Sequence, residues 1–378
     1  RGADLVESLA KSENIIFETT GLPLTPYYSA SKFRWLKDNL PASRQDTTIF
    51  GTLSSFLVQR LTVEKKAAID QTNAARTQLM NIRTIDWDPE LMKLFGLEGI
   101  RLPMIRPTAH RFGMVQMPAG AAPLLACIGD QQSAMLGLGV MEKGDGGINY
   151  GTGGFLMVNT GASLVPAKGL MASVHYSTDK ERYYLLEGSV NAVGEALEWL
   201  RVRLGMFKEY AEVDDLCWKA SGDVVGFTGL NGTGAPHWES AGSTAVHGLS
   251  IDSTPADIVR GTVEGIAFFM KDIAEEIKSA GIEPASFTLS GGLASLSYLV
   301  QVQCDLLQKN AVVSTVQEVS ALGAALLAGL KQGRWTAGEV KTMVSRGDVV
   351  NGEAPPGAER RSRRWRELHR MTRELDSV

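Results

Sequence analysis

The sequence has few cysteines, little net charge and no long apolar run. Cys127, Cys217 and Cys304 lie far apart among 378 residues, which excludes a disulfide framework and favours a reducing, cytoplasmic setting. The net charge of −4 leaves no excess of basic residues for binding nucleic acid or an anionic membrane. No apolar stretch reaches the roughly 18–20 residues of a membrane span. We therefore predict neither a nucleic-acid partner nor a membrane partner.

Several common catalytic motifs are also missing. The sequence contains no Gly-Lys dipeptide, so a Walker A loop is excluded, and no Gly-x-Gly-x-x-Gly of a Rossmann fold. His-Glu-x-x-His and Gly-x-Ser-x-Gly are absent as well. The five histidines, at positions 110, 175, 237, 247 and 369, show no metal-ligand spacing. No side chain is therefore predicted as a metal ligand.

Hydrophobic periodicity predicts an α/β protein. We expect helices at 4–11, 29–36, 49–61, 191–204, 255–279, 296–308 and 319–330, and strands at 123–128, 148–150, 155–158, 183–186, 287–289 and 312–313. A polar, glycine-rich stretch at 139–147 marks a domain boundary. The predicted units are residues 1–140, 141–345 and a tail at 346–378, in which residues 359–373 form a basic, solvated terminal helix.

Asp130 is the most conspicuous polar residue, because it follows an apolar run and begins a predicted helix. A carboxylate in this position of an α/β sheet can take a proton from a hydroxyl group. Aspartate is also a favoured helix N-cap. Considered alone, the residue favours the cap.

Glycines cluster at three further points. Gly151, Thr152 and Gly153 join two strands, as a cradle for phosphate oxygens or as a plain hairpin turn, and the spacing does not decide between these. Gly291 and Gly292 lie between a strand and a helix, which suits a nucleotide at a helix N-terminus, although a plain turn is favoured on this observation alone. Gly194 lies in a predicted helix, where glycine costs about 1 kcal/mol relative to alanine, so it has a packing reason or a ligand reason.

The order of the motifs is more specific than any one of them. Gly-Asp-Gln-Gln at 129–132 is followed by Tyr-Gly-Thr-Gly at 150–153, Leu-Glu-Gly at 186–188, Gly-Ala-Pro-His-Trp at 234–238, Gly-Gly-Leu at 291–293 and Ala-Leu-Gly-Ala-Ala at 321–325. Residues 20–32, 50–52 and 72–77 fit the same pattern. The whole chain thus resembles the FGGY carbohydrate kinases, and among them the glycerol kinase branch most of all.

The resemblance implies two actin-like (ribonuclease H-like) domains that flank a cleft, and phosphorylation of a small polyol or sugar by ATP with Mg²⁺. It implies that Asp130 is the general base, and that Tyr27, Gln131 and Phe155 contact the polyol. Homo-oligomers are common in the family. The nucleotide side is expected to include Gly151, Thr152, Gly153, Gly194, Glu198, Gly291 and Gly292.

Three departures from the family pattern carry expectations of their own. Glu198 stands where a glutamine is usual, and Leu296 and Ser297 replace an asparagine pair, which changes the adenine contacts. The strand hairpin and the arginine, glutamate and tryptophan that open family members do not precede Arg1. We therefore expect a first domain truncated at its N-terminus and a chain that is inactive alone. The alternative is a non-catalytic nucleotide-binding or regulatory relative of the sugar kinases.

Overall fold

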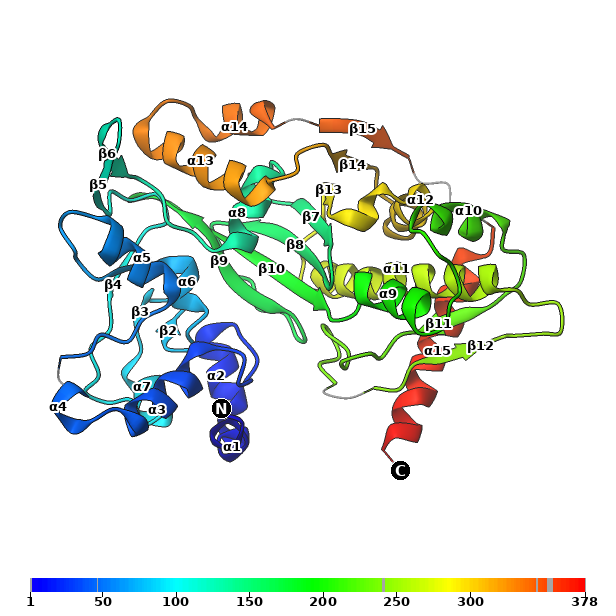
Figure 1. Cartoon of the computed structure of the whole chain (residues 1–378), viewed down its shortest axis with the longest axis horizontal. Helices are drawn as coiled ribbons and strands as arrows, with labels where there is room; N and C mark the ends of the chain where they lie inside the picture. Colours follow the sequence, from blue (N-terminus) through cyan, green and yellow to red (C-terminus); the bar gives the residue numbers. More distant parts are fainter. Residues whose placement is uncertain (1, 46, 240–241, 345, 352–355, 378) are drawn as a thin grey trace.

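The computed structural model describes residues 2–45, 47–239, 242–344, 346–351 and 356–377. The chain forms two lobes connected through one large sheet (Figure 1). In the first lobe, short helices surround three small sheets, in which β1 pairs with β4, β2 with β3 and β5 with β6. Its elements are α1 Ala3–Ser8, η1 Ala10–Ser12, α2 Glu13–Thr20, α3 Ser29–Asn39, α4 Ala42–Gln45, α5 Leu53–Leu61, β1 Ala68–Asp70, α6 Gln71–Ala75, β2 Met80–Asn81, β3 Asp86–Trp87, α7 Pro89–Leu94, β4 Met104–Arg106, β5 Gly113–Met117 and β6 Gly120–Leu124.

The second half of the chain builds a seven-stranded sheet in the order β15-β14-β13-β7-β8-β10-β9. The neighbours of β13 run parallel to it, and the remaining pairs are antiparallel. The elements after β6 are α8 Asp130–Gly137, β7 Asp145–Tyr150, β8 Gly154–Gly161, β9 Met171–Ser177, β10 Arg182–Val190, α9 Gly194–Val202, α10 Ala211–Lys219, β11 Val225–Phe227, β12 Ala245–His247, α11 Pro255–Ser279, β13 Ser286–Ser290, η2 Gly292–Ser295, α12 Ser297–Leu307, β14 Ala311–Ser314, α13 Val319–Gln332, α14 Ala337–Met343, β15 Arg346–Val350 and α15 Ala358–Asp376.

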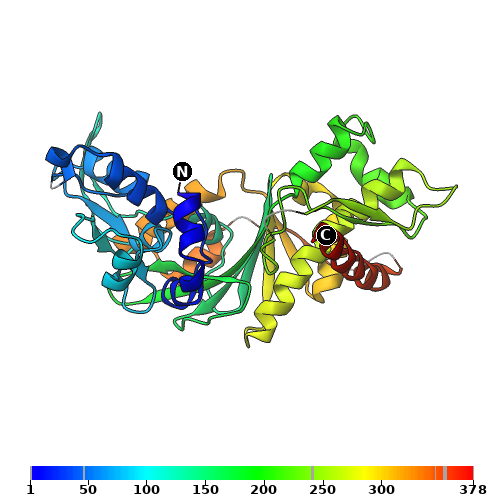
Figure 2. The same ribbon diagram turned by 90° about the horizontal axis from the view of Figure 1, so that it is seen from below.

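Helices cover both faces of this sheet because its strands are apolar on both sides. Leu156 and Val158 of β8 belong to the core that contains α11. Met157, between them, packs in a second cluster with Met135 of α8 and Val319 of α13, as the alternation of side chains along a strand requires. Figure 2 shows yellow α11 and orange α13 on opposite sides of the strands. The sheet thus holds α8, the helix that begins at Asp130, next to α13.

Most of the predicted elements are confirmed, with small shifts of their ends. The 255–279 helix has the predicted bounds, and Thr254 and Asp257 form a capping box at its start. The helix predicted from residue 49 begins at Leu53. The strand predicted at 123–128 is wrong: β6 ends at Leu124, and residues 125–129 belong to no strand or helix.

The terminal helix is present but is not a solvated tail. Trp365 is fully buried and its ring lies 4.7 Å from that of Phe269. Arg361, also buried, forms an ion pair with Glu264 of α11. The sequence shows Trp365, Leu368 and Met371 on one side of this basic helix, and the prediction was wrong because Trp365 on that side packs on the core instead of facing solvent. Among the described residues, no helix has both the length and the apolar character that crossing a bilayer requires.

Candidate active site

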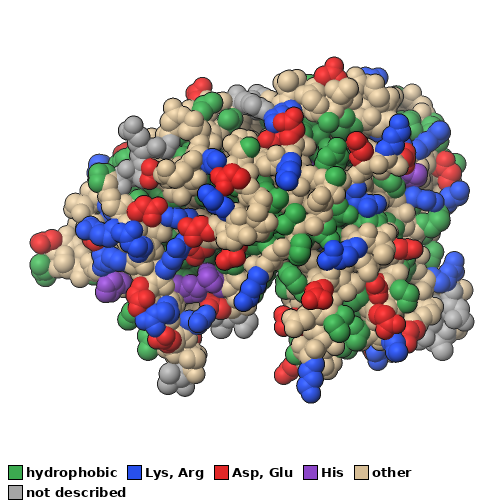
Figure 3. Space-filling model, turned by 180° about the vertical axis from the view of Figure 1, so that it is seen from behind, with side chains coloured by type: hydrophobic (Ala, Val, Ile, Leu, Met, Phe, Trp, Pro, Cys, Tyr) green, Lys and Arg blue, Asp and Glu red, His purple; other side chains and the backbone are tan. Residues whose placement is uncertain are grey.

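Two cavities meet at the turn between β7 and β8. The interdomain cavity, of about 1010 Å³, is lined by both lobes, including Tyr27 of the first lobe and Phe155 of β8, and Figure 3 shows a notch between the lobes from behind. The glycine-rich cavity, of about 850 Å³, lies between the β7–β8 turn, α9, α10 and η2. Gly151 and Thr152 line the second cavity, whereas Gly153 lines the first. The turn therefore separates a cavity between the lobes from a cavity within the second lobe.

Asp130 is the first residue of α8 and lies exposed in the interdomain cavity. The N-cap is Gly129, so Asp130 is not the capping residue. Its Oδ1 accepts the neighbouring Gln131 N–H at 2.8 Å. The cap interpretation is therefore wrong, because Asp130 is the first residue inside the helix and its side chain lines the cavity.

The other predicted substrate contacts lie around the same cavity. Gln131 follows Asp130 on α8, and Phe155 begins β8 next to the glycine turn. Tyr27 is 77% exposed at the rim, and its ring meets that of Tyr28 edge-on with centroids 5.6 Å apart. The structure thus brings Tyr27, Gln131, Phe155 and Asp130 to one cavity, while their roles stay predictions.

The glycine turn lies directly against the start of α9. The carbonyl oxygen of Gly151 accepts the Gly194 N–H at 2.9 Å, and that of Thr152 accepts the Val193 N–H at 3.0 Å. A Cβ on Gly194 would lie 2.7 Å from the Gly151 oxygen. Close packing against the glycine turn therefore explains why a glycine begins this helix. Gly194 also lies in the wall of the glycine-rich cavity.

Gly291 and Gly292 differ in what they require. Gly291 has φ +91°, and a Cβ there would lie 2.4 Å from the Tyr150 oxygen, so the backbone needs a glycine. A Cβ on Gly292 would meet no atom within 4 Å, because this residue faces the open cavity. Gly292 therefore leaves room for a ligand, whereas Gly291 serves the turn.

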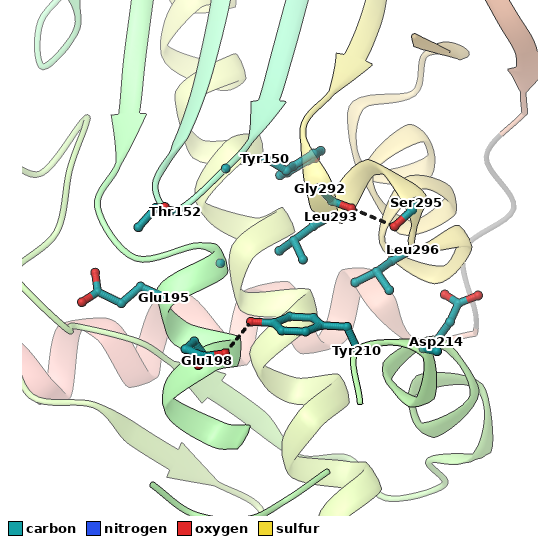
Figure 4. Close-up of a pocket in the computed structure, with 13 residues that line it drawn as sticks. Tyr150, Thr152, Glu195, Glu198, Tyr210, Asp214, Gly292, Leu293, Ser295 and Leu296 are labelled. Atoms are coloured by element: carbon teal, nitrogen blue, oxygen red, sulfur yellow. Dashed lines mark hydrogen bonds between the residues drawn. The ribbon is translucent and has the colours of Figure 1, made fainter. Parts of the chain in front are cut away.

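Glu198 lies on α9 in the wall of the glycine-rich cavity (Figure 4). It accepts hydrogen bonds from Arg201, at 2.7 Å, and from the Tyr210 hydroxyl, at 3.1 Å. The bond from Arg201 is the main reason that the pKa of Glu198 is below its usual value. Opposite, Leu296 lines the cavity, while the Ser297 hydroxyl donates to Asp214 at 2.5 Å. Position 198 thus presents a paired carboxylate to this cavity.

Sequence reasoning assigned no role to a buried charged pair in the interdomain cavity. Glu187 is fully buried and forms an ion pair with Arg76. Next to the pair, the Tyr28 hydroxyl donates to the Met171 sulfur at 3.0 Å, and burial raises the Tyr28 pKa to about 12. Glu187 lies in the Leu-Glu-Gly motif and Arg76 in the 72–77 segment, so the sequence marked both positions but not their contact across 111 residues of chain.

Comparison with known proteins identifies the family. The models "FGGY family of carbohydrate kinases, N-terminal domain" and "C-terminal domain" match residues 1–137 and 146–331. The chain belongs to the FGGY family of carbohydrate kinases. A glycerol kinase of Enterococcus casseliflavus is 36% identical over 90% of this chain and 70% of its own length, and one of Rhodospirillum centenum is 36% identical over 96% and 75%. Plasmodium falciparum glycerol kinase with ADP superposes with a TM-score of 0.91 at 30% identity, over 98% of this chain and 77% of that one.

The FGGY assignment confirms the predicted class of enzyme, a carbohydrate or polyol kinase that uses ATP. It also confirms the α/β fold with two domains. Because the N-terminal model matches from residue 1, the expected missing N-terminal segment gains no support. The exact domain ends, the oligomeric state and the roles of single residues stay predictions.

Proposed function

We propose that this FGGY kinase transfers the γ-phosphoryl group of ATP to a hydroxyl group of a small polyol, with glycerol as the leading candidate, and that Asp130 is the general base. The observation that carries the proposal is the pair of cavities separated by the glycine turn, with Asp130 exposed in one and Gly292 open to the other. The names of the glycerol kinase relatives support the choice of polyol.

In the proposed reaction, the polyol occupies the interdomain cavity and the nucleotide occupies the glycine-rich cavity. Phosphoryl transfer needs little covalent help from a protein, and it depends on positioning and on charge stabilisation. Asp130 accepts the proton of the attacking hydroxyl, and Gln131 hydrogen-bonds the polyol. Tyr27 and Phe155 contact the polyol from the two lobes. Closure of the lobes removes water that would compete as the acceptor.

Mg²⁺ belongs to this proposal as a companion of the nucleotide. Among the described residues, no group of three or more His, Cys, Asp or Glu side chains could hold a metal ion. Mg²⁺ in kinases is bound by phosphate oxygens, waters and only one or two carboxylates. A metal ion that arrives with ATP needs no such cluster of side chains, and it would neutralise charge on the phosphates.

The test is ADP release by the full-length protein on a panel of glycerol, other small polyols and pentuloses, with Asp130→Asn beside it. We expect release that depends on the polyol, and a loss of about 10²–10⁴-fold in kcat for Asp130→Asn. Glu90→Gln, which changes an exposed carboxylate in the first turn of α7, is the matched control and should leave the rate unchanged.

Three results would change the proposal. Equal rates for the wild type and Asp130→Asn would remove the general base. A preference for a pentulose over glycerol would change the substrate. Nucleotide binding without ADP release by the full-length protein on any substrate of the panel would favour the non-catalytic relative, whereas the expectation of an inactive chain predicts no release from residues 1–378 alone. Glu198 motivates the non-catalytic alternative, because a carboxylate in place of the usual glutamine changes a wall of the glycine-rich cavity.

A further inference from the structure

The segment that leads to Asp130 is held by contacts from the first lobe. Residues 125–129 belong to no strand or helix, although the Gly129 carbonyl oxygen, at the N-cap of α8, accepts the Ser133 N–H at 2.8 Å. The Gly129 N–H donates to the Thr72 Oγ1 at 2.8 Å. The Cys127 N–H donates to the Thr108 oxygen at 3.0 Å, and its Sγ lies 3.5 Å from the Asp70 Oδ2. The residue just before Asp130 is therefore tied to the start of α6.

Asp70 fixes the direction of the Thr72 hydroxyl. Asp70 is fully buried and is the N-cap of α6, accepting the N–H groups of Thr72 at 2.9 Å and Asn73 at 3.2 Å. It also accepts the Asn73 side chain at 2.6 Å and the Thr72 hydroxyl. A carboxylate only accepts hydrogen bonds, so the Thr72 proton points to Asp70 and the oxygen lone pair is left for Gly129.

The opposite side of Asp130 is held by α13. The Ser320 hydroxyl donates to the backbone carbonyl oxygen of Asp130 at 3.1 Å, and the Ser133 hydroxyl donates to the backbone carbonyl oxygen of Ser320 at 2.6 Å. A Cβ on Gly323 would lie 1.8 Å from the Ser133 oxygen, so the two helices are in close contact. With α13 as a fixed support, the contact to Thr72 sets the backbone orientation at the start of α8.

We propose that Asp70 and Thr72 are positioning residues, which set the orientation of the Asp130 carboxylate through the Gly129 amide. This inference rests on the proposed role of Asp130 as general base. Without the Thr72 hydroxyl, a partly buried N–H would have no partner, which is costly enough to shift the segment. A displacement of about 1 Å of a catalytic group can lower the rate by about 100-fold.

The variant Thr72→Val removes the hydroxyl and keeps the shape of the side chain, whereas Thr72→Ser keeps the hydroxyl. Thr77→Val is the matched control. Thr77 is as deeply buried as Thr72, and its hydroxyl likewise makes two hydrogen bonds, donating to the Ala74 carbonyl oxygen at 2.6 Å and accepting the Leu79 N–H at 3.1 Å. It does not contact the segment before Asp130.

The first measurement is amide hydrogen exchange over residues 127–133. We expect faster exchange at Gly129 in Thr72→Val, and wild-type exchange there in Thr72→Ser and Thr77→Val. The second measurement is polyol-dependent ADP release, in which Thr72→Val should lower kcat about 10- to 100-fold with little change in the KM for the polyol. Thr72→Ser should restore most of this loss.

Unchanged exchange at Gly129 in Thr72→Val would overturn the inference, and this measurement needs no turnover. Faster exchange with a wild-type kcat would also overturn it, because the contact would then not position the base. If Asp130→Asn keeps the wild-type kcat, the proposed function fails instead. If Thr72→Val has the wild-type kcat while Asp130→Asn is inactive, the positioning role is contradicted and the proposed general base is not.

Discussion

The buried pair of Glu264 and Arg361 should be the strongest single attachment of α15 to the second lobe. Glu264 of α11 is fully buried and accepts two hydrogen bonds from Arg361, at 2.6 and 2.7 Å. It also accepts the Tyr298 hydroxyl of α12 at 2.6 Å. Glu264→Gln keeps the shape but leaves the Arg361 charge buried without its partner. Breaking such a pair costs about 3–5 kcal/mol of unfolding free energy, and we expect a loss of this size.

Urea unfolding followed by tryptophan fluorescence measures this loss, because Trp365 lies one turn after Arg361 in the same core. The double variant Glu264→Gln with Arg361→Met removes both charges, so it should lose less than the sum of the two single variants. Glu367→Gln, at an exposed pair with Arg370, is the control and should be close to the wild type. A loss below about 1 kcal/mol for Glu264→Gln, or strict additivity in the double variant, would show that the buried pair does not hold α15 to the second lobe.

Two further predictions concern the glycine-rich cavity and pH. Gly292→Leu fills open space next to the proposed nucleotide, so we expect ADP to bind at least about tenfold more weakly, as measured by calorimetry, with an unchanged melting temperature. His175 is fully buried, and desolvation lowers its pKa to about 4. Between pH 6.5 and 4 the unfolded chain binds a proton there that the folded chain does not, so stability should fall with falling pH by about 3 kcal/mol in total. His175→Gln should show a smaller fall over the same range, as measured by urea unfolding.

Each of these predictions has its own contrary result. Gly338 in α14 also has open space around it but lies outside both cavities, so Gly338→Leu should bind ADP like the wild type. Equal ADP affinity for Gly292→Leu and Gly338→Leu would show that the nucleotide does not occupy the space in front of Gly292. A pH profile of stability that is identical with and without His175 would show that this imidazole is not held neutral by burial.

The sequence predicted elements well wherever a local rule decides the structure. The 255–279 helix follows from its apolar period, its cap residue and the proline at its first position. The helix at Asp130 follows from the polar residues that end an apolar run. The two strands around Gly153 follow from short apolar runs on either side of a glycine turn. The strand predicted from the apolar run at 123–128 was wrong, because composition does not show whether a partner strand is available.

The contacts that complete the site could not be predicted, because their partners are distant in the sequence. Gly129 and Thr72 are 57 residues apart, and Glu264 and Arg361 are 97 apart. The basic composition of α15 indicated a solvated surface, yet one arginine is neutralised by a buried carboxylate that lies on another helix. Asp70 offered a local signal, an aspartate between a strand and a helix, which is typical of an N-cap. Nothing local showed that this cap also supports the segment before Asp130.

Following phosphoryl transfer itself gives the sharpest test of the proposed reaction. Phosphorus NMR of the full-length protein with ATP, Mg²⁺ and glycerol distinguishes a phosphomonoester of the polyol from free phosphate. We expect the wild type to form the phosphomonoester and Asp130→Asn to form it about 10²–10⁴-fold more slowly. Formation at the same rate in both proteins would contradict the role of Asp130 as general base.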